Sequence, residues 1–193
     1  MRVLVAILAF VFVSSTGFGK DLGPKPPGQF DYYLLTLTWA PSFCATHSDP
    51  QECGHDLGFA LHGLWPEMVG GDYPTGCSKV ALTDETRKQF QSIYASPSLI
   101  DHEWSTHGTC SGLAPADYFA LSKADVAAIV IPPAYRTATT LAAADSDAVR
   151  QAFMAANPTL AADDFFVTTG NGRVTDVRFC VTKDDVFRSC SKQ

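Results

Sequence analysis

The chain of 193 residues is poor in basic residues, with 14 lysines and arginines against 20 acidic residues and a formal net charge of −6. Such a protein cannot hold a nucleic-acid backbone through a broad basic face, so any phosphate contact must be local. The chain also lacks a Cys-x-x-Cys pair, which argues against a zinc knuckle or a thioredoxin-like redox site. No apolar run beyond residue 13 is long enough to cross a bilayer, so we expect no membrane contact by the mature protein.

The first segment is the one long apolar run. Residues 3–13 (VLVAILAFVFV) follow a single basic residue, Arg2, and the run ends in small residues through Gly19. This pattern is typical of a signal peptide, although a buried first helix is an alternative. We therefore expect a signal peptide over 1–19, a Pro/Gly-rich arm over 20–29, a single domain over 30–193, and a secreted or periplasmic protein.

All six cysteines follow the expected cleavage point. An even number of cysteines in an exported chain favours disulfides over free thiols. Spacing alone favours two pairs of near neighbours and leaves the two middle cysteines for each other. The predicted bridges are Cys44–Cys53, Cys180–Cys190 and Cys77–Cys110.

Runs of aromatic and β-branched residues are separated along the chain by a block of helical patterns, which predicts an α+β fold with a mainly antiparallel central sheet flanked by several helices rather than a parallel α/β sheet. A hairpin is indicated by Asn171-Gly172, the turn that two-residue loops prefer. The expected strands cover 32–39, 58–65, 165–169, 174–182 and a short final segment at 186–190. The expected helices cover 83–94, 116–130 and 145–156, and a further helix within 97–110 is expected to stop at Gly108.

Three of the five histidines fall in two compact clusters. The first is H-G-L-W-P-E, beginning at His62, and the second is H-E-W-S-T-H-G-T-C, beginning at His102. If the second cluster is helical, Glu103 and His107 stand on one face because each residue turns about 100°. A carboxylate beside an imidazole raises the pKa of the imidazole and orients the ring.

Two other interpretations of these histidines remain open. The zinc-protease motif H-E-x-x-H needs histidines four residues apart, but His102 and His107 are five apart and about 140° apart on a helix. A zinc site that uses His62 as a third ligand is a further possibility. The histidines could also be structural hydrogen-bonding groups of the core.

The two clusters, about forty residues apart and in this order, resemble the two active-site segments of the ribonuclease T2 family. The stretch L-T-W-A-P-S-F-C and the pattern around R-F-C-V are also similar to that family, so the resemblance covers most of the chain after Phe30. It implies an endoribonuclease that cuts single-stranded RNA through a 2′,3′-cyclic phosphate to 3′-phosphate ends, needs no metal or other cofactor, leaves DNA intact and acts as a monomer.

The resemblance also implies the role of each catalytic residue. His107 would take the proton of the ribose 2′-OH, His62 would protonate the 5′-oxygen leaving group, Glu103 would assist at the phosphorane, and His102 would bind phosphate. A displacement at phosphorus by an internal hydroxyl needs a base and an acid on opposite sides, which agrees with two histidines from different segments.

Two further points concern rate and specificity. Family members commonly carry a lysine where this chain has Thr106, so a weakly active or inactive exported RNA-binding protein, or a toxin-like one, is the alternative function. By resemblance, Trp65 and Glu67 line a pocket for a nucleobase, and Tyr73 is a weaker candidate for the same pocket. Trp104 is expected to pack inward, and no function is assigned to His47 or His55.

Overall fold

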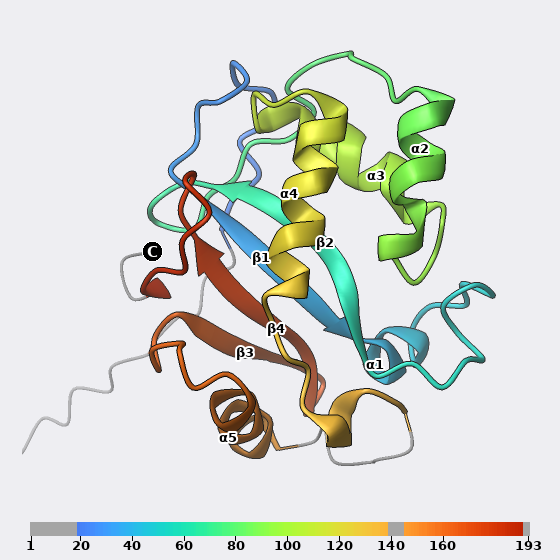
Figure 1. Cartoon of the computed structure of the whole chain (residues 1–193), viewed down its shortest axis with the longest axis vertical. Helices are drawn as coiled ribbons and strands as arrows, with labels where there is room; N and C mark the ends of the chain where they lie inside the picture. The colour runs from blue at the N-terminus through green and yellow to red at the C-terminus, as the bar shows by residue number, and fades with distance from the viewer. Residues whose placement is uncertain (1–18, 139–144, 191–193) are drawn as a thin grey trace, which may run out of the picture.

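The computed structural model describes residues 19–138 and 145–190 (Figure 1). A four-stranded antiparallel sheet with the strand order β2-β1-β4-β3 forms its centre. The strands are β1 (Tyr32–Trp39), β2 (Phe59–Glu67), β3 (Phe165–Gly170) and β4 (Arg173–Val181). The sheet, its flanking helices and three disulfides confirm the predicted α+β class.

Five α-helices accompany the sheet among the described residues. In Figure 1, α4 crosses the front of the sheet, α2 and α3 lie together beyond β2, and α5 lies beside β3 at the other end. The helices are α1 (Ala40–Cys44), α2 (Asp84–Phe90), α3 (Leu99–Thr106), α4 (Pro115–Ala127) and α5 (Ser146–Ala156). Three short 3₁₀ turns cover Gln91–Ile93, Gly108–Cys110 and Pro133–Tyr135.

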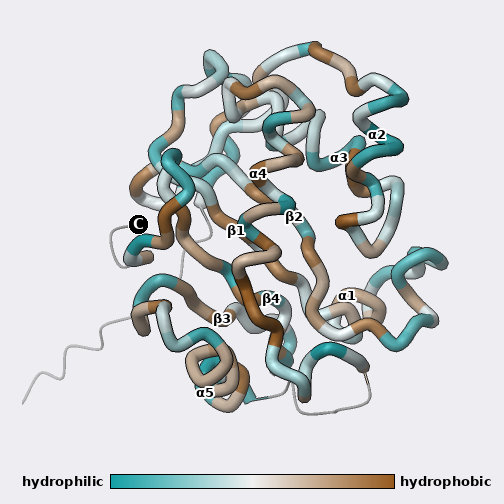
Figure 2. Tube along the Cα trace, in the orientation of Figure 1, coloured by the Kyte–Doolittle hydropathy of each residue, from teal (hydrophilic) through white to brown (hydrophobic). Residues whose placement is uncertain are grey.

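The principal hydrophobic core lies on one face of the sheet. Successive residues of a strand point to opposite faces, and Leu35 and Leu37 of β1 point into this core with 0 % exposure. Figure 2 shows apolar stretches along the central strands, above all along β4. The opposite face of β1 carries Leu34, Thr36 and Thr38, and this second face supports the candidate site.

Most predicted elements are confirmed, with shifts at their ends. Thr83 caps α2 as expected, because its side chain accepts a hydrogen bond from the Thr86 N–H. The hairpin turn is confirmed, since Asn171 and Gly172 both adopt positive φ. The predicted final strand over 186–190 is wrong. Phe187 forms only an isolated bridge with Val181, because the backbone leaves the sheet after one pairing.

The three predicted disulfides are all present, with Cys44–Cys53, Cys77–Cys110 and Cys180–Cys190 bonded. The Cys77–Cys110 bridge spans 33 residues and ties the loop after β2 to the turn that follows α3. Both segments adjoin the histidine clusters, so this bridge limits how far they can separate.

The segment before β1 contacts the folded chain. The Leu22 N–H donates to the Tyr73 carbonyl at 2.9 Å, and the Tyr73 N–H donates to the Lys20 carbonyl at 3.1 Å. The predicted signal peptide lies outside the described residues except for its last one. Within the described part of the chain, no helix combines the length and the apolar character needed to cross a membrane.

Candidate active site

A β-bulge in β2 places His62. Thr36 of β1 pairs with Gly63, but the next residue, Leu37, pairs with Leu61, so His62 is an extra residue in the ladder. Bulges redirect side chains and are frequent beside active sites. The bulge lets Leu61 and Leu64 both enter the core while His62 remains on the second face, with its side chain 30 % exposed.

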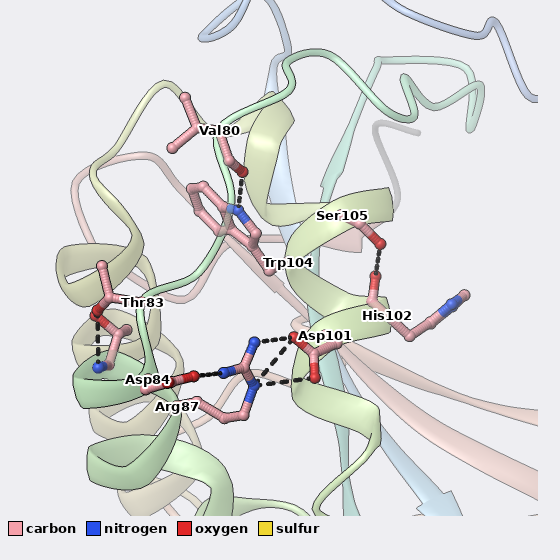
Figure 3. A network of polar contacts seen from close by, with 9 residues as sticks. Val80, Thr83, Asp84, Arg87, Asp101, His102, Trp104 and Ser105 are labelled. Carbon is pink, nitrogen blue, oxygen red and sulfur yellow. Dashed lines mark hydrogen bonds and ion pairs between the residues drawn. The ribbon is translucent and has the colours of Figure 1, made fainter.

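Helix α3 is fastened to its surroundings on the side away from β2. In Figure 3, Arg87 of α2 bonds Asp101, and the Trp104 indole N–H donates to the Val80 carbonyl. Trp104 is 3 % exposed and lies in the core, as predicted. The His102 side chain points away from this network in Figure 3, and it is exposed. These contacts fix the helix that supplies the second histidine cluster.

The helix ends one residue before His107. Residue Thr106 is the last of α3, and His107 is the C-cap, whose N–H donates to the Glu103 carbonyl at 3.0 Å. The predicted stop of this helix at Gly108 is confirmed, because Gly108–Cys110 forms a 3₁₀ turn that does not continue α3. His107 is 9 % exposed and Glu103 is 0 % exposed.

A hydrogen bond joins the two clusters at Glu103. The Trp65 indole N–H donates to Glu103 Oε2 at 2.9 Å, and His62 Nε2 lies 3.7 Å from Glu103 Oε1. This approach requires glycine at position 63, because a Cβ there would lie 1.8 Å from Glu103 Oε2 and 2.4 Å from Trp65 Nε1. The glycine of H-G-L-W thus has a steric cause that the sequence alone did not reveal.

Trp65 lies against both His62 and His107. Its ring centroid is 5.1 Å from that of His62, edge to face, and 5.1 Å from that of His107, stacked. His102 meets His107 edge to face at 6.2 Å. The structure therefore brings His62, His102, Glu103 and His107 together around one indole, although the two clusters come from a strand and a helix.

Burial dominates the protonation of the two inner histidines. Loss of hydration, with smaller contributions from the nearby His102 and His62, lowers the pKa of His107 to about 3. The pKa of His62 falls to about 4 for the same reason, while the charge of Asp176 opposes the shift. Both rings are neutral near pH 7. This neutral state departs from the expectation that a neighbouring carboxylate would raise a histidine pKa.

Glu103 shifts in the opposite direction, which explains that departure. Burial raises the pKa of Glu103 to about 8, and the hydrogen bond from Trp65 only partly opposes the shift. The carboxyl group therefore holds a proton near pH 7 and presents no negative charge to His62. Glu103 Oε1 and His107 Nδ1 are buried with no hydrogen-bond partner among the described residues. Both atoms can therefore form hydrogen bonds with a molecule bound at the site.

The three residues predicted for the base pocket lie in two places: Trp65 and Glu67 on β2, and Tyr73 on the loop that follows β2. Glu67 lies two residues beyond Trp65 on β2 and is 6 % exposed, and burial raises the pKa of Glu67 to about 8. Tyr73 lies on the loop after β2, where its backbone is bonded to the segment before β1. Asp21 pairs with Tyr73 through an isolated backbone β-bridge, and its negative charge acts to raise the pKa of His107. The arm and loop therefore lie on the His107 side of the site.

Sequence reasoning missed three residues of the second face of the sheet. Thr38 Oγ1 bonds His62 Nδ1 at 2.9 Å and Asp176 Oδ1 at 2.7 Å. Arg178 lies with its guanidinium carbon 5.2 Å from the centroid of the Trp65 ring. The only sign of them in the sequence is that polar residues recur at alternate positions of β1 and β4. No sequence motif distinguishes these polar residues from those of an ordinary solvent-facing strand.

His102, Glu103 and His107 could also hold a metal ion. Their ligand atoms all lie within 4.8 Å of one another. The two imidazoles approach each other although their residues are five positions apart, with ring centroids 6.2 Å from one another. Metal independence thus stays a prediction.

Neutral histidines from a strand and a helix end, placed around a buried carboxyl group, form an arrangement that is able to exchange protons with a bound molecule. The chain belongs to the ribonuclease T2 family, whose model matches residues 30–190. A ribonuclease of Aeromonas hydrophila is 44 % identical over 96 residues, which are 49 % of this chain and 44 % of that protein. Ribonuclease DdI of Dictyostelium discoideum is 33 % identical over 135 residues, 62 % of this chain and 60 % of that protein. The chain thus spans about half the length of these relatives.

Solved structures share the fold. RNase NT in complex with 5′-AMP aligns with a TM-score of 0.62 at 21 % identity, covering 83 % of this chain and 90 % of that one. Ribonuclease MC1 from the seeds of bitter gourd aligns with a TM-score of 0.61 at 22 % identity, covering 80 % of this chain and 90 % of that one.

Proposed function

We propose that this protein is an endoribonuclease that cleaves single-stranded RNA by transphosphorylation. The observation that carries the proposal is the convergence of His62 and His107, from separate segments, on Trp65 and the buried carboxyl group of Glu103. An internal attack of the ribose 2′-OH on phosphorus needs one group to accept a proton and another to donate one. Family membership and the complex of RNase NT with 5′-AMP support RNA as the substrate.

His107 is the proposed general base. A pKa of about 3 keeps its ring neutral in mildly acidic solution, and the Nδ1 atom has no partner among the described residues. The ring takes the proton of the 2′-OH as the 2′-oxygen attacks phosphorus. His102, exposed and beside His107, would contact the phosphate oxygens.

His62 is the proposed general acid, and its proton comes from the pair that it forms with Glu103. With the pKa of His62 at about 4 and that of Glu103 at about 8, the pair holds one proton between these values. In the free protein this proton rests on Glu103. A phosphodiester anion at the site favours the imidazolium ion. A transfer across the 3.7 Å between Glu103 Oε1 and His62 Nε2 then gives charged His62 beside an ionised Glu103.

The remaining steps follow from this placement. As the P–O5′ bond breaks, His62 gives its proton to the leaving 5′-oxygen, and the product is a 2′,3′-cyclic phosphate. Water opens the cyclic phosphate to a 3′-phosphate, with the two histidines in exchanged roles. DNA has no attacking hydroxyl, so it stays intact. No step in this sequence requires a metal ion.

Trp65 and Glu67 are proposed to line the pocket of one nucleobase, with Tyr73 as a weaker candidate. A carboxyl group with a pKa of about 8 carries a proton in mild acid, so Glu67 can both donate to a ring nitrogen and accept from an exocyclic amine. Trp65 already contacts both histidines and Arg178, so a base would stack only on the part of the indole that these side chains leave free.

Export of the protein is part of the proposal. The three disulfides fit an oxidising compartment outside the cytosol. We propose that residues 1–19 direct the export and are then removed. We further propose that the mature protein acts as a monomer.

The test measures RNA cleavage with excess EDTA at mildly acidic pH for the purified protein and three variants. His62→Gln and His107→Gln are expected to lower kcat at least 100-fold, the lower end of the contribution of a general acid or base. His55→Gln is the matched control, because this ring is exposed on the loop before β2. Intact RNA with the parent protein, or near-normal turnover by either of the first two variants, would refute the proposal.

A further inference from the structure

A buried carboxylate on β4 lies behind His62. Asp176 is 8 % exposed, and the backbone register pairs it directly with Thr38 of β1, which is also 8 % exposed. Directly opposed residues share a face of the sheet. Neither residue belongs to the two histidine clusters, and Asp176 is 138 residues from Thr38 along the chain.

The two hydrogen bonds that link Asp176 to His62 through the Thr38 hydroxyl can be oriented in only one way. The Thr38 hydroxyl donates its one proton to Asp176 Oδ1 at 2.7 Å, so toward His62 Nδ1, 2.9 Å away, Thr38 Oγ1 can only accept. The neutral ring must therefore carry its proton on Nδ1. The free Nε2 then faces Glu103 Oε1, which is the atom placed to supply the catalytic proton.

Donors from three strands hold Asp176 in its ionised form. Besides the bond from Thr38, its Oδ2 accepts from the Thr168 hydroxyl of β3 at 2.8 Å and from the Arg178 guanidinium of β4 at 3.1 Å. These contacts lower the pKa of Asp176 although burial opposes the shift. An ionised Asp176 excludes the reverse arrangement, in which the hydroxyl would point at the ring and leave two acceptors 2.7 Å apart.

The charges around His62 come from several elements. Asp176 favours the imidazolium ion, whereas His47, His102 and Arg178 disfavour it. Glu103 faces the ring from α3. Two further acids, Asp49 and Glu52, line a cavity of about 70 Å³ beside the ring. Among these groups only Asp176 reaches the ring through a directed hydrogen-bond chain.

We propose that Thr38 and Asp176 are positioning residues for His62. They fix the tautomer and the orientation of the ring, and the negative charge stabilises the imidazolium ion before its proton is transferred to the 5′-oxygen. This inference rests on the proposed function, since it concerns the acid step of that reaction. It predicts that damage to the chain slows the departure of the leaving group and spares the attack of the 2′-OH.

The test compares two substrates that differ in their need for an acid. A ribonucleoside dinucleotide has a poor alkoxide leaving group, whereas a ribonucleoside 3′-(4-nitrophenyl phosphate) has a leaving group that departs without protonation. Thr38→Val and Asp176→Asn are expected to lower kcat for the dinucleotide about 10- to 100-fold, less than the loss of the acid itself. The nitrophenyl ester should be cleaved within about threefold of the normal rate, and Thr38→Ser should recover most of the dinucleotide activity.

Asp125→Asn is the matched control. Asp125 is a buried acid of α4, 2 % exposed, so it reports the effect of losing a buried carboxyl group elsewhere. Equal slowing of both substrates by Thr38→Val and Asp176→Asn would overturn the positioning role, as would unchanged cleavage of the dinucleotide. A parent protein that cleaves neither substrate would instead overturn the proposed function.

Ring ¹⁵N NMR tests the same chain without activity. His62 of the parent protein is expected to carry its proton on Nδ1, and Thr38→Val should yield a mixture of tautomers or the Nε2–H form. A parent spectrum with the Nε2–H form would contradict the inference even in an active enzyme. Urea unfolding of each variant establishes that a loss of rate does not come from a loss of fold.

Discussion

Replacing Glu103 with glutamine should stabilise the protein relative to the parent, by an amount that grows as the pH rises. The carboxyl group is 0 % exposed, and burial raises its pKa from 4.5 to about 8. Between these values the folded protein holds a proton that the unfolded chain has released, so stability falls as the pH rises. The inner histidines act in the opposite direction, because their lowered pKa values make stability rise with pH up to about 6.5. Because parent and variant contain the same histidines, the difference between their unfolding free energies at each pH cancels the contribution of these histidines.

The size of the effect follows from the pKa shift. One pKa unit corresponds to about 1.36 kcal/mol, so retaining the proton of Glu103 costs the folded state about 3 kcal/mol more at pH 7 than at pH 5. Glutamine is neutral at both values and can still accept from the Trp65 indole N–H. The Glu103→Gln variant should therefore gain about 3 kcal/mol relative to the parent between pH 5 and pH 7.

Urea unfolding at pH 5, 6 and 7 measures this gain. The slope of the unfolding free energy against urea concentration should be the same for parent and variant, which checks that both unfold in two states. Glu85→Gln is the control, because Glu85 is exposed in the first turn of α2 and should give parallel curves. If Glu103→Gln also runs parallel to the parent across this range, the buried carboxyl group is ionised in the free protein. The proposed proton inventory of the site would then be wrong.

Three further predictions concern the same site. Gly63→Ala places a Cβ 1.8 Å from Glu103 Oε2, so kcat/KM should fall at least about 100-fold, and an alanine variant of normal activity would contradict the steric cause. Removing the Cys77–Cys110 bridge by a double serine substitution should lower the unfolding free energy by about 3–4 kcal/mol, from the entropy of a loop of this length; urea unfolding measures the loss. The pH profile of kcat/KM should keep its plateau well below pH 6 and decline near pH 8, because the pKa of His107 is about 3 and that of Glu103 about 8; an acid limb above pH 6 would refute these roles.

Local patterns in the sequence predicted most of the fold. The strand at Tyr32–Trp39 and the Asn171-Gly172 turn were correct because their signals are contained within a few residues. The predicted strand at 186–190 failed because whether the chain stays in a sheet depends on a partner strand that the local sequence does not specify. The strand order β2-β1-β4-β3 depends on such long-range pairing throughout.

The candidate site divides in the same way. The histidines and Glu103 lie in two short clusters, so the residue types and their spacing pointed to acid–base chemistry. Thr38 and Asp176 meet only because β1 and β4 pair in one register, and no spacing in the sequence encodes that contact. The protonation of the site was also beyond sequence reasoning, since it depends on the burial that lowers the pKa of His62 and raises that of Glu103.

The proposed reaction requires that a 2′-OH attack phosphorus with histidine acid–base assistance. The most direct measurement follows a short RNA that carries one 2′-O-methyl group, in excess EDTA, with the product ends identified by mass spectrometry. We expect 2′,3′-cyclic phosphate ends, or the 3′-phosphate ends formed from them, at every cleaved linkage and no cleavage at the methylated nucleotide. Cleavage at that nucleotide, 5′-phosphate ends, or loss of activity in EDTA would contradict the proposed reaction.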